Sequence, residues 1–235
     1  MNESFARTRM LVGADGLHTL SQSHIIVFGI GGVGSYAVEA LARCGVGHLT
    51  FIDYDTIAQS NINRQIHANI STVGMLKTDA MRARVLSVNP DVQVDIFPIC
   101  ATAENIPALL ADGADYIVDA IDSVTSKLAL AEYAYQNGLP LISSMGMANK
   151  LHPEQIELAD LFSTSVCPLA RVMRTELRKR GVAKLAVCYS REPALKPDAR
   201  MDGETGRVLG SVSFVPSAAG LMIAGKVVRD ICGLL

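Results

Sequence analysis

A glycine-rich segment near the N-terminus has the spacing of a nucleotide-binding turn. It reads GIGGVG and satisfies the pattern G-x-G-x-x-G through Gly29, Gly31 and Gly34, with Gly32 doubling the central glycine. Glycines at this spacing permit a tight turn and let backbone N–H groups approach a phosphate at the positive end of a helix. Asp53 ends the next apolar run, where a carboxylate can bind a ribose hydroxyl. The pattern therefore predicts a bound nucleotide rather than a turn that serves packing alone.

Two cations downstream of this turn bear on which nucleotide is bound. Arg64 lies in the polar run that follows Asp55, and Lys77 lies on the next expected helix. Hydride transfer to or from a nicotinamide cofactor requires orientation of the nicotinamide ring, whereas nucleotidyl transfer requires fixed cations and a metal ion around the α-phosphate. Arg64 and Lys77 suit the second task and favour ATP, although an isolated Arg or Lys is more often a solvated surface residue.

Asp122 is a candidate magnesium ligand. It follows the short apolar run Tyr116–Asp119, so we expect it at the carboxyl end of the sheet, where ligands of open α/β sheets bind. A carboxylate at that edge can hold Mg²⁺ against a triphosphate. The alternative role is to cap the helix that is expected to begin near Ser123.

The composition narrows the class of protein. The 235 residues are 49% hydrophobic with a formal net charge of -2, which predicts a globular chain without a global attraction to nucleic acid. The five cysteines are scattered and lack the paired C-x-x-C spacing of a structural zinc site, so we expect reduced thiols and no zinc. The sequence has no apolar signal segment and no run of about 18 apolar residues, which predicts a cytoplasmic protein without a membrane span.

Alternating strands and helices must position these residues. The apolar run His24–Gly29 is typical of a strand buried on both faces of a parallel sheet. A helix over Ser35–Cys44 and a strand over Leu49–Asp53 complete a βαβ unit around the glycine turn. Further helices are expected at Thr72–Val88, Asn105–Leu110 and Val124–Asn137, and further strands at Val92–Phe97, Tyr116–Asp119 and Leu139–Ser143. This alternation predicts an α/β fold with a doubly wound, mostly parallel, Rossmann-like sheet.

Changes in the pattern of strands, helices and polar stretches along the sequence predict three parts of the chain. We expect an N-terminal segment at residues 1–22, a nucleotide-binding core at residues 23–144, and a C-terminal α+β extension at residues 145–235 that packs on the same core and provides substrate and dimer contacts. The extension should contain strands at Gln155–Leu158 and Lys184–Tyr189, helices at Pro168–Arg180 and from Pro216 onward, and a mobile loop at Ser190–Arg207.

The first helix of the extension is a candidate RNA-binding surface. Its cations oppose only Glu176, and they are Arg171, Arg174, Arg178, Lys179 and Arg180. Three of them, at positions 171, 174 and 178, share one helical face. That face is suited to contact phosphates, and the alternative is an ordinary solvated surface.

Taken in order, the motifs resemble those of the ubiquitin-activating superfamily, which includes the bacterial adenylyltransferases of thiamine and molybdopterin synthesis. The motifs are GIGGVG, FIDYD, SNINRQ, GMLK and DAIDS, and they extend over about half of the chain. The resemblance implies that a substrate carboxylate attacks the α-phosphate of ATP. It also implies an ATP and Mg²⁺ site built from Asp53, Asn61, Arg64, Gln65, Lys77 and Asp122, and we add the neighbouring Asp55.

Within the superfamily, the sequence resembles the tRNA threonylcarbamoyladenosine dehydratases. The shared features are NRQIHA at residues 63–68, AIDS in the motif that contains Asp122, CPLARVMRTELRKRG at residues 167–181, and the lack of paired zinc cysteines. The resemblance implies that the threonylcarbamoyl carboxylate next to the tRNA anticodon is adenylated. An internal carbamoyl atom then expels AMP and closes a ring, which requires proximity and exclusion of water rather than a catalytic cysteine.

The same resemblance implies a homodimer and sets the expected partners. Arg7 and Arg9 are candidates to reach the ATP of the partner subunit, with a disordered tail as the alternative. The tRNA is the expected substrate, and a monovalent cation and a sulfur-relay protein are further candidates. Ser211–Phe214 stands where other members of the group carry a cysteine, which argues against a sulfur-relay role.

Two other functions stay open. The first is adenylation of the C-terminal Gly-Gly of a small sulfur-carrier protein, against which the missing zinc cysteines and thioester cysteine argue. The second is an NAD-dependent oxidoreductase or an inactive nucleotide-binding scaffold.

Overall fold

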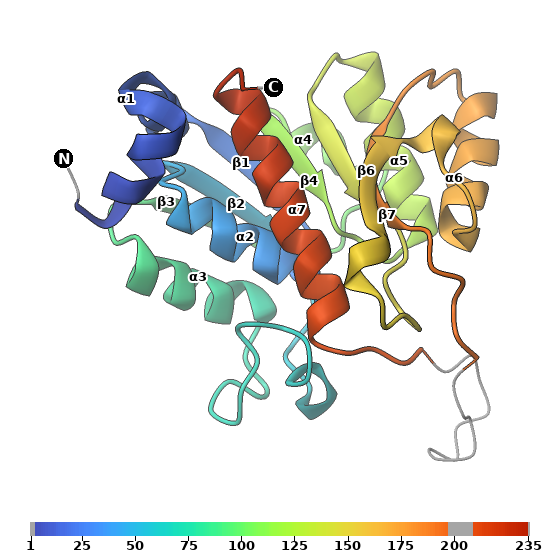
Figure 1. Ribbon diagram of the computed structural model, residues 1–235, viewed down its shortest axis with the longest axis horizontal. Helices are drawn as coiled ribbons and strands as arrows, with labels where there is room; N and C mark the ends of the chain where they lie inside the picture. The colour runs from blue at the N-terminus through green and yellow to red at the C-terminus, as the bar shows by residue number, and fades with distance from the viewer. Residues whose placement is uncertain (1–2, 197–208, 235) are drawn as a thin grey trace.

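A single seven-stranded sheet organises the protein, as seen in the computed structural model, which describes residues 3–196 and 209–234 (Figure 1). The strand order is β3-β2-β1-β4-β5-β7-β6, and neighbours pair in parallel except β6, which is antiparallel to β7. The strands are β1 (His24–Phe28), β2 (His48–Ile52), β3 (Gln93–Phe97), β4 (Tyr116–Asp119), β5 (Leu141–Ser144), β6 (Ile156–Asp160) and β7 (Ala186–Ser190). The predicted doubly wound, mostly parallel sheet is confirmed.

Helices cover both faces of the sheet and bury two apolar clusters. The longer helices are α1 (Ala6–Gln22), α2 (Gly34–Arg43), α3 (Lys77–Val88), α5 (Val124–Gln136), α6 (Pro168–Lys179) and α7 (Phe214–Ile231), with the short α4 (Ile106–Leu109) between β3 and β4. Side chains of a strand alternate between faces, so Ile25 and Val27 of β1 pack with α2, α3 and α7. Ile26 and Phe28 pack with α4, α5 and α6 on the other face.

Residues of the expected C-terminal extension continue the same sheet and core. Strands β7 and β6 follow β5 directly in the sheet, and α7 lies beside α2 (Figure 1). Gly220 makes this helix pair close, because a Cβ atom at that position would lie 2.4 Å from the backbone oxygen of Val33. Helix α7 therefore packs directly against the start of α2. Of the predicted loop Ser190–Arg207, the part from residue 197 onward lies outside the described residues.

Two expectations about helices are corrected. The alternative of a disordered N-terminal tail is wrong, because α1 is a helix with Leu17 and Leu20 buried. The φ of 79° at Gly13 kinks α1, and this break obscures the helical periodicity in the sequence. The helix expected from Thr72 begins only at Lys77, because the backbone of residues 74 and 75 bonds to Ile57 instead of continuing a helix.

Candidate functional site

The glycine turn between β1 and α2 has room for a ligand on one side only. Gly29 has a φ of 86°, and a Cβ atom there would lie 2.6 Å from the backbone oxygen of Ala120. A Cβ atom on Gly34 would lie 1.8 Å from the backbone oxygen of Gly29, whereas one on Gly31 would meet no atom within 4 Å. Helix α2 has no side-chain cap, and the N–H of Ser35 donates to the backbone oxygen of Gly31 at 3.0 Å, so the positive end of the helix lies at this turn.

Asp53 ties the end of β2 to the glycine turn. Its Oδ2 accepts a hydrogen bond from the N–H of Ile30 at 2.6 Å, and its Oδ1 accepts one from the N–H of Asp55 at 2.9 Å. Burial raises the pKa of this carboxyl group above its ordinary value, which the charge of Lys77 and these hydrogen bonds partly offset. A carboxylate has about four lone-pair sites, so capacity for a ribose hydroxyl remains.

Lys77 is buried rather than solvated. Lys77 is the first residue of α3 and is only 6% exposed. Its Nζ lies 2.5 Å from Oδ2 of Asp55, and its backbone N–H donates to the backbone oxygen of Asp55 at 3.0 Å. The ammonium group is therefore held in one position beside the loop that follows β2.

The structure brings Arg64 to the glycine turn. A Cβ atom on Gly32 would lie 3.5 Å from Cγ of Arg64, and Nη1 of Arg64 donates to the backbone oxygen of Ser60 and to Oδ1 of Asn63, both at 2.9 Å. Two further residues of this segment have different surroundings. Oδ1 of Asn61 accepts from the N–H of Ala58 at 3.1 Å, and Gln65 is buried with no hydrogen-bond partner for Oε1 within the described residues.

Asp122 is exposed just beyond β4, close to the loop that follows β2. The charges of Asp55 and then Asp122 raise the pKa of the exposed Tyr54 phenol, so both carboxylates lie near that ring. The alternative that Asp122 caps α5 is wrong, because the N-cap is Ser123, whose side chain accepts from the N–H of Ser126. Asp122 is thereby left facing solvent at the edge where the glycine turn also lies.

The acidic groups at this edge fit Mg²⁺ that arrives with a triphosphate. Across residues 3–196 and 209–234, no group of three His, Cys, Asp or Glu side chains is arranged to hold a metal ion. Mg²⁺ commonly takes one or two protein carboxylates and completes its shell with phosphate oxygens and water. Exposed Asp122 provides such a carboxylate, so it suits a magnesium–nucleotide complex rather than a protein-only metal cage.

A fully buried ion pair supports the turn that leads to Asp122 and was not predicted from the sequence. Nζ of Lys127 lies 2.8 Å from Oδ2 of Asp119, and both side chains are at most 1% exposed. The hydroxyl of Ser143 donates to the same oxygen at 2.6 Å, while Oδ1 of Asp119 accepts from the N–H of Ile121 at 3.1 Å. This network fixes the turn from β4 to Asp122. The one available signal was a lysine within an otherwise apolar helical pattern.

A buried histidine beside the predicted cations also escaped the sequence analysis. His67 is 3% exposed, and neither ring nitrogen has a hydrogen-bond partner within the described residues. Burial, followed by the charges of Lys77 and Arg84, lowers its pKa to about 4. His67 is therefore neutral at pH 7.

The basic residues predicted for RNA contact differ in their surroundings on α6. Nη1 of Arg174 donates to the backbone oxygen of Thr164 at 3.0 Å, and the guanidinium of Arg178 lies over the ring of Phe162 at 5.3 Å. Lys179 pairs with Glu176 and Arg180 with Glu132, and Arg171 is exposed. The shared face of residues 171, 174 and 178 thus has one cation turned into the fold and two at the surface.

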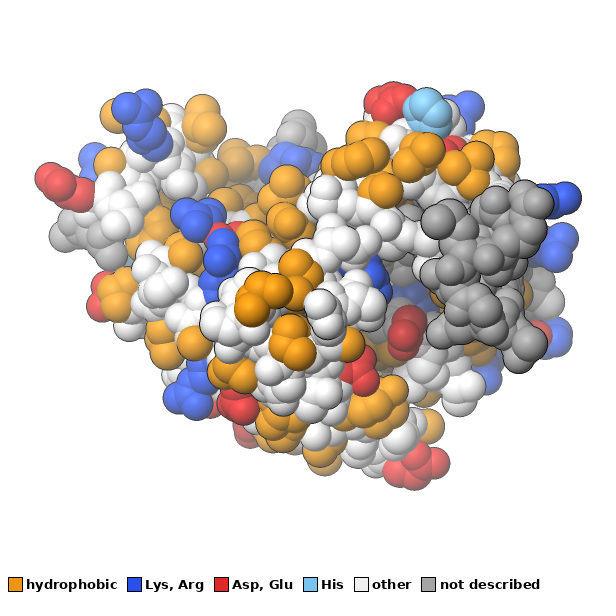
Figure 2. Space-filling model, turned by 90° about the horizontal axis from the view of Figure 1, so that it is seen from below, with side chains coloured by type: hydrophobic (Ala, Val, Ile, Leu, Met, Phe, Trp, Pro, Cys, Tyr) orange, Lys and Arg blue, Asp and Glu red, His pale blue; other side chains and the backbone are white. Residues whose placement is uncertain are grey.

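Arg7 and Arg9 lie at the start of α1, away from the glycine turn of the same chain. Phe5 and Leu17 pack on Gly45, which precedes β2, so α1 lies at the amino edge of the sheet. Figure 1 shows α1 on the opposite side from the loop that follows β2, and Figure 2 views the carboxyl edge, where basic and acidic side chains surround a recess.

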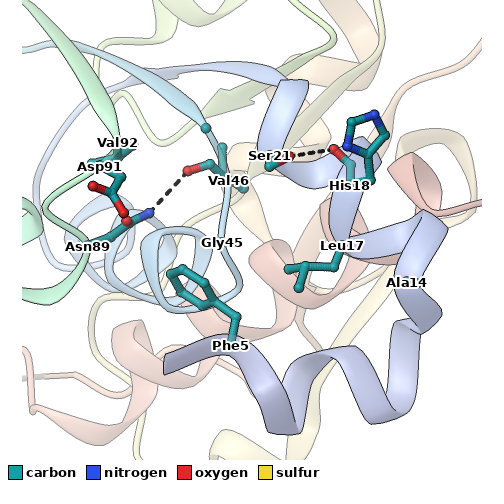
Figure 3. A pocket seen from close by; sticks show the side chains of 11 residues that line it. Phe5, Ala14, Leu17, His18, Ser21, Gly45, Val46, Asn89, Asp91 and Val92 are labelled. Atoms are coloured by element: carbon teal, nitrogen blue, oxygen red, sulfur yellow. Dashed lines mark hydrogen bonds between the residues drawn. The ribbon is translucent and has the colours of Figure 1, made fainter. Parts of the chain in front are cut away.

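Two described cavities also lie at the amino edge. The first, of about 360 Å³, lies between α1 and the turns before β2 and β3, with Phe5 and Leu17 facing Asn89 (Figure 3). The second, of about 930 Å³, lies where β4, β5 and β7 begin and α7 ends. Neither contains a residue of the predicted ATP site.

The described helices include none that is both long and apolar enough to cross a membrane. The cysteines are free thiols, of which Cys167 and Cys188 are buried and Cys100 is exposed.

Comparisons with known proteins show which family the chain belongs to. A model of the ThiF family matches residues 5–234. The tRNA threonylcarbamoyladenosine dehydratase of Bacillus subtilis is 40% identical over an alignment of 242 residues, gaps included, that covers 98% of this chain and 95% of that protein. The Escherichia coli protein of the same name, whose structure was solved in complex with ATP, superposes with a TM-score of 0.91 at 33% identity, over 98% of this chain and 94% of that one. The chain therefore belongs to the ThiF family, alongside relatives named as tRNA threonylcarbamoyladenosine dehydratases.

Proposed function

We propose that the protein is an ATP-dependent tRNA threonylcarbamoyladenosine dehydratase. The observation that carries this proposal is the arrangement at the carboxyl edge, where buried Lys77, partly buried Arg64 and exposed Asp122 accompany a glycine turn that is open at Gly31. Fixed cations beside a phosphate-binding turn suit nucleotidyl transfer, because negative charge redistributes around the α-phosphate in the transition state. The high coverage of the Bacillus subtilis relative supports the tRNA substrate.

Each group has an assigned task in the first step. The N–H groups around Gly31 bind phosphate, Asp53 accepts from the ribose, and Arg64 and Lys77 face the charge that develops on the α-phosphate. Asp122 would hold Mg²⁺, which would supply neutralisation of the phosphate charge. The substrate carboxylate attacks the α-phosphorus, the bond to the β-phosphate oxygen breaks, and pyrophosphate leaves. Asn61 and Gln65 line the same segment and complete the proposed ATP site.

The second step requires no nucleophile from the protein. A carbamoyl atom of the substrate attacks the activated carbonyl carbon, the bond to AMP breaks, and the substrate loses the elements of one water molecule. Cys167 and Cys188 suit this mechanism, because burial raises the pKa of the Cys188 thiol to about 12 and Cys167 is only 2% exposed. The Cys188 thiol thereby stays protonated, and Cys167 is out of reach.

The proposed partners are a second subunit and tRNA, and the proposed location is the cytoplasm. In the homodimer, Arg7 or Arg9 of one subunit would complete the ATP site of the other, since neither lies near the glycine turn of its own chain. On α6, exposed Arg171 and Arg178 are the better candidates for phosphate contact, because Arg174 bonds to Thr164.

Activation of a sulfur-carrier protein is the second candidate function. Partial relatives carry names of that kind, such as a SAMP-activating enzyme E1 of Haloferax volcanii at 33% identity over 61% of this chain. This candidate would require a Gly-Gly carrier protein as substrate.

The deciding experiment measures release of pyrophosphate and AMP from ATP and Mg²⁺ with tRNA that carries threonylcarbamoyladenosine, with unmodified tRNA, and with a Gly-Gly carrier protein. We expect release only with the modified tRNA, accompanied by loss of one water mass from the nucleoside. The variants Lys77→Ala and Asp122→Ala should lower the rate at least about a hundredfold. Release that depends on the carrier protein would replace the dehydratase proposal, and wild-type rates in both variants would overturn the assigned site.

A further inference from the structure

Asn63 joins two segments that lie far apart in the sequence. Its Nδ2 donates to the backbone oxygen of Ser211 at 2.9 Å, and its Oδ1 accepts from Nη1 of Arg64 at 2.9 Å. Nη1 also donates to the backbone oxygen of Ser60, so two acceptors fix one corner of the guanidinium group. A guanidinium carries five N–H donors, and Nε and Nη2 of Arg64 remain for a phosphate.

The segment that contains Ser211 is itself held in place from the other side. Asn149 donates its N–H to the backbone oxygen of Gly210 at 2.8 Å, and its Oδ1 accepts from the N–H of Gly210 at 2.6 Å. Asn149 has a φ of 59°, in the left-handed region that asparagine adopts more readily than other residues with a side chain. Beyond Ser211, α7 brings Pro216 to within 3.2 Å of a Cβ atom built on Gly32. Ser211 therefore has a fixed position relative to the glycine turn.

We propose that Asn63 is a positioning residue that orients Arg64 toward the nucleotide and couples ATP binding to the segment before α7. Its carbonyl oxygen holds the cation, and its amide group holds the backbone at Ser211. Coupling between two sites is reciprocal, so ATP that engages Arg64 stabilises this segment, and the ordered segment strengthens ATP binding. The inference rests on the proposed role of Arg64 at the phosphates.

Two substitutions separate the two bonds. Asn63→Ala removes both contacts, whereas Asn63→Asp keeps an acceptor for Arg64 and loses the donor to Ser211. Asn69→Ala is a matched control, because Asn69 is an exposed asparagine of the same segment whose Oδ1 accepts only within a local turn, from the N–H and hydroxyl of Ser71. Thermal unfolding of each variant reports any global loss of structure.

The first measurement is the Kd of Mg²⁺-ATP by titration calorimetry. We expect about tenfold weaker binding in Asn63→Ala, which is the size of a lost hydrogen bond to a charged group. Asn63→Asp should lose less affinity, because only the contribution of the ordered segment is removed, and Asn69→Ala should bind within about twofold of the parent. Parent affinity in Asn63→Ala would overturn the orienting role. Absence of ATP binding in the parent would contradict the proposed function itself. That result differs from a failure of the orienting role, in which the parent still binds ATP.

The second measurement is hydrogen–deuterium exchange of residues 209–214 with and without ATP, which needs no tRNA turnover. ATP should slow exchange there in the parent and in Asn69→Ala, and should have no effect in Asn63→Ala or Asn63→Asp. A purely structural role would instead raise exchange throughout the protein. Slowing by ATP that persists in Asn63→Asp, or no slowing in the parent, would overturn the coupling.

Discussion

Single side chains at the carboxyl edge owe their properties to burial. Lys77, at 6% exposed, has exchanged water for the carboxylate of Asp55 at 2.5 Å, so its charge has a fixed position before any ligand arrives. His67 has lost water without gaining a partner within the described residues. A cation fixed in advance stabilises developing charge without reorganisation, whereas an unpaired buried imidazole stays neutral.

The buried His67 predicts a loss of stability in mild acid. Its pKa is about 4 in the folded protein and 6.5 in the unfolded chain, so the unfolded chain binds the proton first as the pH falls. The stabilisation is complete above pH 6.5 and is lost toward pH 4, amounting to about 2 kcal/mol between pH 7 and pH 5. Between pH 7 and pH 5, the free energy of unfolding of His67→Leu should therefore fall by about 2 kcal/mol less than that of the parent, as measured by urea denaturation. Equal losses in parent and variant would contradict the assignment.

The strand–turn–helix element around the glycine turn is the part of the site that sequence reasoning located best. A buried parallel strand is a continuous apolar run, and the conformation at Gly29 excludes a side chain, so local sequence dictates the local structure. The segment between β2 and α3 was harder to predict. Its turns depend on backbone hydrogen bonds between Ile57 and residues 74 and 75, and the hydrophobic periodicity of the sequence does not predict these bonds.

Two glycines of the turn predict opposite effects of the same substitution. Gly31→Ala adds a methyl group to open space, so the melting temperature should stay close to the parent value while Mg²⁺-ATP binds about tenfold more weakly. Gly34→Ala forces a methyl group to 1.8 Å from the backbone oxygen of Gly29 and should destabilise the fold by about 1–3 kcal/mol or more. Thermal unfolding and calorimetry distinguish the effects of the two substitutions. Unchanged ATP affinity in Gly31→Ala would show that the phosphate does not bind at this turn.

The turn after β4 depends on the buried pair of Lys127 and Asp119. Lys127→Met leaves the carboxylate of Asp119 without a cation and should cost about 3–5 kcal/mol in the free energy of unfolding. The double variant Lys127→Met with Asp119→Asn should recover part of that loss, because no uncompensated charge remains. Urea denaturation of both variants tests this, and an equal or larger loss in the double variant would show that the ion pair does not set the cost.

At the scale of the whole molecule, one chain does not bring all the predicted residues together. Arg7 and Arg9 lie with α1 at the amino edge, whereas the glycine turn, Arg64 and Asp122 lie at the carboxyl edge (Figure 1). A symmetric dimer can place the N-terminal residues of one subunit beside the site of the other. The proposed role of these arginines is therefore a property of the assembly.

Mixed dimers test that role directly. We expect Arg7→Ala/Arg9→Ala and Asp122→Ala each to abolish AMP formation with the modified tRNA. After subunit exchange at equal amounts, half the dimers are mixed and each has one intact site, so about a quarter of the parent activity should return. A mixture that stays inactive although mixed dimers form would show that the arginines act within their own chain, and an active Arg7→Ala/Arg9→Ala variant would show that they have no role.

The sequence by itself determined the α/β class, the glycine turn and the identity of the charged residues at the carboxyl edge. These follow from local rules, because apolar runs and glycine spacing act over a few neighbouring residues. Only the tertiary structure revealed the buried pair of Lys127 and Asp119 and the link from Asn63 to Ser211 across 148 positions. Such contacts depend on where the sheet and α7 bring distant backbone together, and a hydrogen bond between distant residues leaves no periodic trace in the chain.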